Sequence, residues 1–169
     1  YDKNFKDKWK EILKKHRIKK LYFEAEDLTV AKRNAFKKIS KGVEFKETLY
    51  EIAEKLRVQK NSTELGKIGK AQGIIEKVFS QIKRELKAGQ TEKQIAWKIK
   101  ELCQKFGADD ISFEPIVGFA QNSASAHHQN TDRKLKKGDI VLIDHGAKFQ
   151  GYCSDMTRMI WTQEPTKKE

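Results

Sequence analysis

The chain has 169 residues, of which 37% are hydrophobic and 36% charged, enough for one ordinary domain or two small ones. No apolar run approaches the roughly 20 residues that span a bilayer, which excludes a transmembrane protein, and no signal-peptide pattern opens the chain. The only cysteines, Cys103 and Cys153, lie far apart. This excludes a disulfide scaffold and a cysteine-rich zinc module, and it predicts a reducing, cytoplasmic location.

The net charge is strongly basic, at +12, and could attract nucleic acid by counterion release. Most of this charge, however, is lysine interleaved with glutamate, as where Lys10 precedes Glu11 and Glu54 precedes Lys55. That pattern is typical of solvated helix faces. Nucleic acid is therefore not the expected partner, and a steep salt dependence of binding would be the sign of one.

Apolar spacing and capping signals predict that the first 110 residues are mostly helical. The expected elements, in chain order, are a helix over 4–16, a short strand over 18–23, helices over 29–39 and 46–56, a long helix from Asn61 to the signal at Gly89, and a helix from Thr91 to Gly107. The last two helices each begin with a capping box. A short helix gives way to polar residues and a fresh cap at 57–61, so we predict one domain over 1–57 and a second over 58–169.

From Ile111 onward the pattern changes to β structure. Strands are expected over 111–117, 139–147 and 152–162, with a small, polar segment over 118–130 and a turn at 149–151. Helices followed by an antiparallel hairpin indicate an α+β fold and not a doubly wound parallel sheet.

Asp144 ends the apolar run Ile-Val-Leu-Ile-Asp at 140–144, where a lone carboxylate would be expensive to bury. Asp155 follows on the next predicted strand. If the hairpin turns about Phe149 and Gln150, the two carboxylates face each other on one side of the sheet. Like charges directly opposite each other destabilise a sheet, so something must compensate them.

A pair of divalent metal ions would compensate the aspartates, because carboxylate oxygens are hard ligands and can bridge two ions. Two alternatives remain open from the spacing alone. The register could slip by one residue, or each aspartate could pair with a basic side chain such as Arg158.

Two adjacent histidines, His127 and His128, precede the hairpin. An extended chain sends neighbouring side chains in opposite directions, so at most one of them is expected to face the aspartates. Histidine suits proton transfer or hydrogen bonding to a developing anion; the alternative is two polar loop residues. His145 follows Asp144 and is expected on the opposite face, in a structural role.

Several stretches resemble the proline-specific metallopeptidases of the pita-bread fold, the Xaa-Pro aminopeptidases and Xaa-Pro dipeptidases (prolidases). They are Phe-Glu-Pro-Ile-Val at 113–117, Asn-Ser-Ala at 122–124 with His127, the run from Thr131 to Ala147 that contains Leu-Ile-Asp-His-Gly-Ala, and Gly-Tyr-Cys-Ser-Asp-Met-Thr-Arg at 151–158. The resemblance implies that 58–169 is the first part of a pita-bread (creatinase/aminopeptidase-like) catalytic domain. Residues 1–57 would be the remnant of a smaller α/β N-terminal domain of the creatinase type.

The resemblance also implies roles for three residues. Asp144 matches the first metal-binding aspartate, Asp155 the aspartate that bridges two ions, and His127 the catalytic histidine that contacts the substrate and stabilises the tetrahedral intermediate. Family members use two divalent ions, commonly manganese, cobalt or zinc, and a metal-activated water attacks the carbonyl before proline. The implied partners are a proline-containing peptide as substrate and a second copy of the chain in a homodimer.

The sequence departs from the family pattern in two ways. The family completes its site with a histidine and two glutamates that come later, whereas this sequence starts at Tyr1 and stops at Glu169. We therefore expect an incomplete chain with two of five ligands, which is a poor enzyme by itself. Ala126 also replaces the usual proline before the histidine. Creatinase-like activity and a non-catalytic pita-bread binding module remain alternatives, although such modules usually lose both aspartates.

Overall fold

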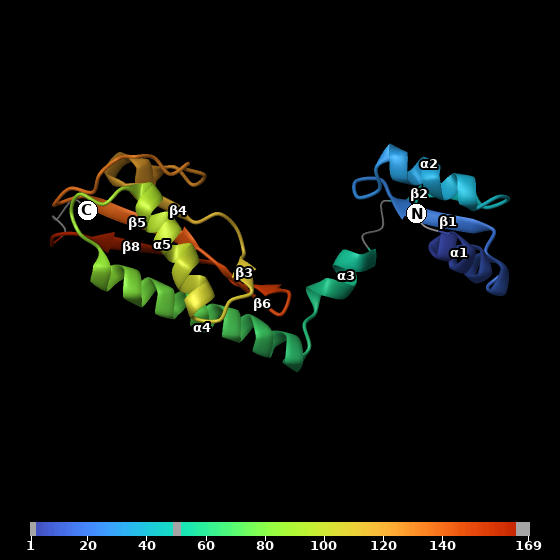
Figure 1. Ribbon diagram of the computed structural model, residues 1–169, viewed down its shortest axis with the longest axis horizontal. Helices are drawn as coiled ribbons and strands as arrows, with labels where there is room; N and C mark the ends of the chain where they lie inside the picture. Colours follow the sequence, from blue (N-terminus) through green and yellow to red (C-terminus); the bar gives the residue numbers. More distant parts are fainter. Residues whose placement is uncertain (1–2, 49–51, 165–169) are drawn as a thin grey trace. The chain divides into compact units, whose positions relative to one another are not determined.

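The structure is a computed structural model that describes residues 3–48 and 52–164 (Figure 1). The chain divides into two compact units, Tyr1–Gln59 and Lys60–Glu169. Among the described residues, no helix is both long and apolar enough to cross a bilayer. The assignment of 1–57 to an N-terminal domain remnant and of 58–169 to the first half of a catalytic domain stays a prediction.

The first unit is built around two parallel strands joined through a helix. Its elements are α1 (Lys3–Lys15), β1 (Lys20–Glu24), α2 (Val30–Ile39), β2 (Glu44–Thr48) and α3 (Ile52–Val58). β1 and β2 pair in parallel, with α2 as the crossover between them. On α1, the Trp9 ring centroid lies 5.2 Å from that of Phe36, and the Trp9 Nε1 donates to Ser40 Oγ at 2.8 Å. These contacts fix α1 against α2.

The predicted helix over 46–56 is wrong in its first part, because Glu44–Thr48 is a strand and the described helix begins at Ile52. In β2 the partly buried Phe45 alternates with the exposed Glu44 and Lys46, which is the period of a strand. Pairing with β1 gives this segment its backbone hydrogen bonds and overrides the helical preference of its lysine and glutamates. Residues 49–51 of the predicted helix lie outside the described residues.

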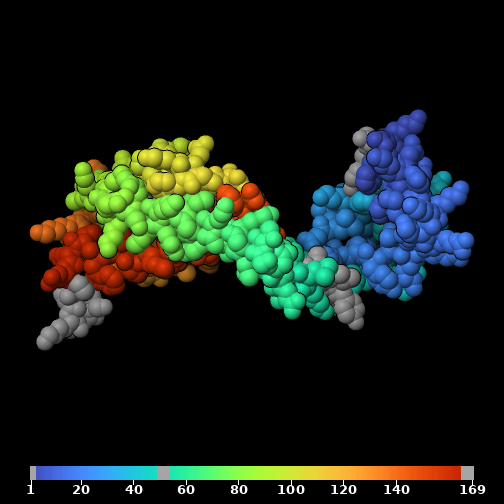
Figure 2. Space-filling model, turned by 90° about the horizontal axis from the view of Figure 1, so that it is seen from below, coloured from blue at the N-terminus to red at the C-terminus, as the bar shows by residue number. Residues whose placement is uncertain are grey.

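Two helices of the second unit, α4 (Ser62–Glu85) and α5 (Glu92–Lys105), start at the predicted capping boxes. The Asn61 side chain accepts a hydrogen bond from the backbone N–H of Glu64, and Thr91 accepts one from Gln94. Both boxes are therefore confirmed. The two helices pack against each other and lie side by side on the surface of this unit (Figures 1 and 2).

The strands of the second unit form two three-stranded antiparallel sheets, ordered β4-β5-β8 and β3-β6-β7. The elements are β3 (Asp110–Ile111), β4 (Ile116–Phe119), the 3-10 helix η1 (Ala120–Ala124), β5 (Ile140–His145), β6 (Ala147–Phe149), β7 (Tyr152–Cys153) and β8 (Met156–Trp161). Val141 and Ile143 on β5 are fully buried in the core that includes α4 and α5, whereas Leu142 and Asp144 are only partly buried. Asp144 therefore lies on the sheet face opposite to the buried one.

The hairpin turns one residue later than predicted, at Gln150–Gly151. Both residues have positive φ, 47° and 82°, as in the two-residue turns that match the twist of paired strands. The register continues into β5 and β8, where Asp144 pairs with Thr157. The predicted direct opposition of Asp144 and Asp155 is therefore wrong by two residues. Because side chains alternate with a period of two, a two-residue shift changes the partner and keeps the face.

Candidate metal centre

Asp144 and Asp155 lie close together where β5 and the hairpin meet. Asp144 is half-buried on β5, and its Oδ1 accepts a hydrogen bond from Thr157 Oγ1 at 2.8 Å. Asp155 is exposed in the short link between β7 and β8. Partial desolvation and the neighbouring Asp144 carboxylate raise the pKa of Asp155. The two carboxylates are therefore near enough to repel each other.

The two alternatives to metal binding, a one-residue slip of the register and pairing with a basic side chain, do not describe Asp144 and Asp155. The register is shifted by two residues, so it does not move either side chain to the other face as a one-residue slip would. Within 3–48 and 52–164, neither aspartate forms an ion pair, and Arg158 Nη1 donates to the backbone carbonyl of Thr157 at 2.9 Å. Two adjacent carboxylates are a donor set that suits hard divalent cations.

Gly146 sets the position of Asp155 through its neighbour Ser154. A Cβ on Gly146 would lie 2.1 Å from the carbonyl oxygen of Ser154, which is far inside contact distance. The Ser112 Oγ lies 2.8 Å from the same carbonyl oxygen and 2.9 Å from the Ala147 carbonyl oxygen, so its single proton can be donated to either. The absence of a side chain at Gly146 lets the β7–β8 link close on β5, and Asp155 follows directly in that link.

The two adjacent histidines point to different surroundings. His127 is exposed in the loop after η1. The His128 Nε2 lies 2.8 Å from Glu92 Oε2 in the interior. His145 is fully buried, its Nε2 is 3.2 Å from the Ile75 carbonyl oxygen, and it takes the structural place that its position after Asp144 predicted.

Sequence reasoning missed Glu92, a fully buried carboxylate at the start of α5. Its Oε1 accepts hydrogen bonds from the Phe119 N–H (2.9 Å) and Asn122 Nδ2 (2.8 Å). Its Oε2 accepts from His128 Nε2 (2.8 Å) and from both the N–H (2.8 Å) and the hydroxyl (2.7 Å) of Thr131. Every donor belongs to the segment that carries His127.

One sequence signal could have revealed Glu92. The buried face of α5 includes Ile95, Ala96 and Ile99, and Glu92 precedes them at the same helical spacing. The capping box uses Gln94 and leaves the Glu92 carboxylate unassigned. A charged residue on the apolar stripe of a helix requires buried partners, because a lone buried carboxylate is costly.

The hydrogen bonds determine the charge of Glu92. Burial opposes its ionised form, but bonds from His128, Thr131, Asn122 and Phe119 outweigh burial and lower the pKa from 4.5 to about 2. The carboxylate is thus ionised at neutral pH and can only accept hydrogen bonds.

A pH dependence of stability follows from this lowered pKa. Because the native carboxyl is the stronger acid, its contribution is complete above pH 4.5 and disappears as the pH falls toward about 2. The free energy of unfolding should fall by about 3 kcal/mol over this pH range. Urea unfolding of the wild type and of Glu92→Gln at pH 7 and at pH 2.5 would measure it. We expect the stability difference between the two proteins to shrink at pH 2.5, and a constant difference would contradict the assignment.

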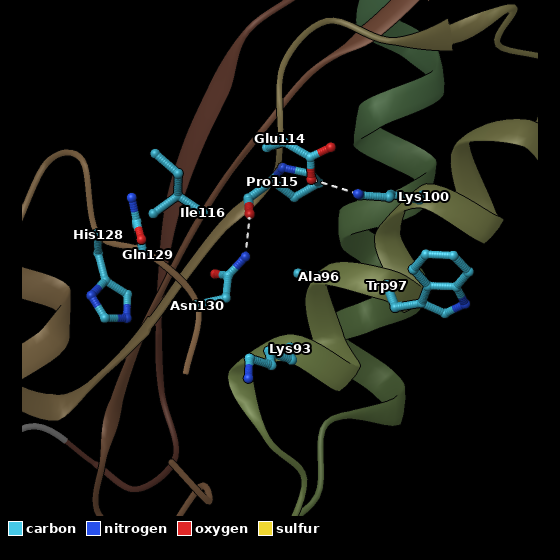
Figure 3. Close-up of a pocket in the computed structure, with 10 residues that line it drawn as sticks. All are labelled: Lys93, Ala96, Trp97, Lys100, Glu114, Pro115, Ile116, His128, Gln129 and Asn130. Carbon is cyan, nitrogen blue, oxygen red and sulfur yellow. Dashed lines mark hydrogen bonds and ion pairs between the residues drawn. The ribbon is translucent and has the colours of Figure 1, made fainter. Parts of the chain in front are cut away.

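A pocket of about 560 Å³ lies between α5 and the end of the His127 loop (Figure 3). Trp97 and Lys100 line it from the helix, and His128 and Asn130 line it from the loop. Figure 3 shows Asn130 turned toward the Pro115 carbonyl, to which its Nδ2 donates at 2.7 Å. His128 thus lines this surface pocket and also contacts the buried Glu92.

Known proteins resemble this chain in sequence and in structure. An uncharacterised peptidase of Staphylococcus aureus is 35% identical over 151 residues, which are 89% of this chain and 43% of the relative. A Staphylococcus epidermidis relative, also an uncharacterised peptidase, is 33% identical over 149 residues. The chain spans less than half the length of the curated relatives it matches.

Solved structures extend this similarity. The Xaa-Pro dipeptidase from Bacillus anthracis superposes with a TM-score of 0.89 at 32% identity, covering 96% of this chain and 45% of that one. The X-Pro aminopeptidase from Thermotoga maritima superposes with a TM-score of 0.88 at 29% identity, covering 97% of this chain and 46% of that one. The prolidase from Pyrococcus furiosus superposes with a TM-score of 0.79 at 31% identity, covering 89% of this chain and 44% of that one. The predicted fold, an α+β first part of a pita-bread domain, is therefore confirmed.

The family model that matches is metallopeptidase family M24, over residues 66–169. That range is more than half of the chain, and it contains Asp144, Asp155, His127 and Glu92. The family is one of metal-dependent peptidases, in agreement with the paired aspartates. The chain belongs to metallopeptidase family M24.

Proposed function

We propose that the full-length protein hydrolyses the peptide bond before proline, as an Xaa-Pro aminopeptidase or Xaa-Pro dipeptidase. The observation that carries the proposal is the pair Asp144 and Asp155, two adjacent carboxylates without a basic partner among the described residues. The similarity to an Xaa-Pro dipeptidase, an X-Pro aminopeptidase and a prolidase supports proline specificity.

Asp144 and Asp155 would hold divalent metal, with manganese, cobalt or zinc as the candidates and two ions as the proposed number. Bound metal would supply Lewis acidity and a water of lowered pKa. The hydroxyl of Thr157 holds one oxygen of Asp144 at 2.8 Å, which restricts rotation of this carboxylate. The carboxylate of Asp155 is exposed and is therefore open to a ligand.

His127 is the proposed substrate-contacting residue. Its ring is exposed, and an imidazole N–H is a suitable donor to a carbonyl oxygen that gains negative charge during attack. Because the His128 ring bonds to Glu92, His127 is the histidine of this loop that can reach a peptide.

The test is hydrolysis of Xaa-Pro peptides by the full-length protein, with Xaa-Ala peptides as the matched control. We expect turnover of Xaa-Pro alone, its loss with a chelator and its return with added Mn²⁺ or Co²⁺. Turnover that survives the chelator would contradict the metal role, and equal turnover of Xaa-Ala would contradict proline specificity. A full-length protein that binds metal and peptide without hydrolysis would favour the binding-module alternative.

The 169-residue chain provides a second comparison. Asp144 and Asp155 supply few of the oxygen ligands that divalent ions require, so water must complete the coordination. We expect weak Mn²⁺ binding by this chain in titration calorimetry and negligible hydrolysis of Xaa-Pro peptides. Robust turnover would show that two carboxylates suffice.

A cytoplasmic location and a homodimeric state belong to the same proposal. Both cysteines are free, Cys103 buried and Cys153 exposed, as a reducing compartment would maintain them. Light scattering of the full-length protein would test the dimer.

A further inference from the structure

The segment 119–131 leaves β4, forms η1 and carries His127 toward the surface. Both of its ends converge on the Glu92 carboxylate. Phe119 and Asn122 bind Oε1 near the start of the segment, and His128 and Thr131 bind Oε2 near its end. The loop is therefore closed by a single side chain from another element, α5.

Further contacts hold this segment in one arrangement. Asn130 Oδ1 accepts from the Val117 N–H at 2.7 Å, while its Nδ2 donates to the Pro115 carbonyl, also at 2.7 Å. A Cβ on Gly118 would lie 2.9 Å from the backbone of Asn122, so η1 packs directly on β4. Ala120 has a φ of 47°, a conformation that a non-glycine residue adopts only when its surroundings enforce it.

We propose that Glu92 is a positioning residue: its ionised carboxylate closes the segment 119–131 and thereby sets the place of His127 relative to the bound peptide. This inference rests on the proposed function, because the position of His127 matters only if His127 contacts the substrate. Glu92 itself is fully buried and touches no substrate.

The chemistry of this cluster requires a carboxylate. An ionised carboxylate only accepts hydrogen bonds, so each of its five partners must donate, and the proton on His128 stands on Nε2. The N-terminus of α5 also favours a negative charge at this position. A glutamine of the same shape would offer one oxygen and turn its N–H groups toward donors on the other side.

The first test compares Glu92→Gln with the wild type in the full-length protein. We expect kcat on an Xaa-Pro peptide to fall about 100-fold, since misplacement of a contacting group by about 1 Å has that effect. KM should change far less, because the loss falls on the transition state. Hydrogen exchange of the backbone amides in 119–131 should rise at least about tenfold more than that of the α4 amides, whose protection falls only with the global stability.

Glu101→Gln is the matched control, since it makes the same change on the exposed side of α5. Glu101 accepts from the Trp97 indole, a bond that glutamine can keep. We expect wild-type kcat and exchange from it.

His128 provides a rescue test of the same arrangement. His128→Gln keeps an N–H donor for Glu92, and His128→Leu removes it. We expect His128→Gln to retain kcat and loop protection near the wild type, and His128→Leu to lose both in part. Equal losses in the two variants would overturn the role of this hydrogen bond.

The outcomes separate this inference from the proposed function. If the wild type shows no Xaa-Pro hydrolysis, the proposed function fails and the role for His127 fails with it, while hydrogen exchange still decides whether Glu92 closes the loop. If the wild type is active and Glu92→Gln is equally active, only the inference is overturned. If exchange rises equally in α4 and in the loop, Glu92 is a general stabiliser of the fold and the inference is also overturned.

Discussion

Gly146→Ala is expected to lower the free energy of unfolding by about 2 kcal/mol, the scale of overpacking in a well-packed interior. It should also weaken metal binding by the full-length protein. A Cβ at this position would stand 2.1 Å from the Ser154 carbonyl oxygen. That oxygen is backbone, so it can yield only if the β7–β8 link moves away from β5. Asp155 is the next residue in the link, and it would move away from Asp144.

Gly73→Ala on α4 is the control, because a Cβ there meets nothing within 4 Å. Alanine is favoured over glycine inside a helix by up to about 1 kcal/mol, so this variant should be slightly more stable than the wild type. Urea unfolding and Mn²⁺ titration of both variants provide the measurement. Wild-type metal affinity in Gly146→Ala would show that the position of Asp155 does not depend on this close approach.

Local signals in the sequence were sufficient for much of the second unit. The capping boxes at Asn61 and Thr91 predicted the starts of α4 and α5, because the partners in such a box are only three residues apart. The continuous apolar run predicted the strand β5, and the alternation of side chains along a strand predicted that His145 lies on the face opposite to Asp144. Each of these features is determined within one element.

Features that depend on distant partners were not predicted. The strand β2 reads as helix by composition, and its pairing with β1 decides its structure. The hairpin register depends on which two residues adopt positive φ, and the sequence Phe149-Gln150-Gly151 permits more than one choice. The role of Glu92 depends on donors that lie 27 to 39 residues away.

Asp155→Asn is expected to abolish metal-dependent hydrolysis by the full-length protein, with a loss of at least about 1000-fold. An amide offers one oxygen where a carboxylate offers two, so it cannot bridge a pair of ions, and it contributes no charge to hold them. Kinetics on an Xaa-Pro peptide with saturating Mn²⁺, together with the metal content of the purified variant, would measure the loss.

The same variant should be more stable than the wild type when metal is absent at neutral pH. Partial desolvation and the Asp144 carboxylate raise the pKa of Asp155, so the folded chain disfavours its ionised form, and stability falls as the pH rises through this pKa. Asparagine removes that repulsion. Asp132→Asn, which alters an exposed ion pair with Lys93, is the control and should leave stability and turnover nearly unchanged. Metal-free Asp155→Asn that unfolds more easily than the wild type would contradict the repulsion between the two aspartates, and retained hydrolysis would contradict the bridging role of Asp155.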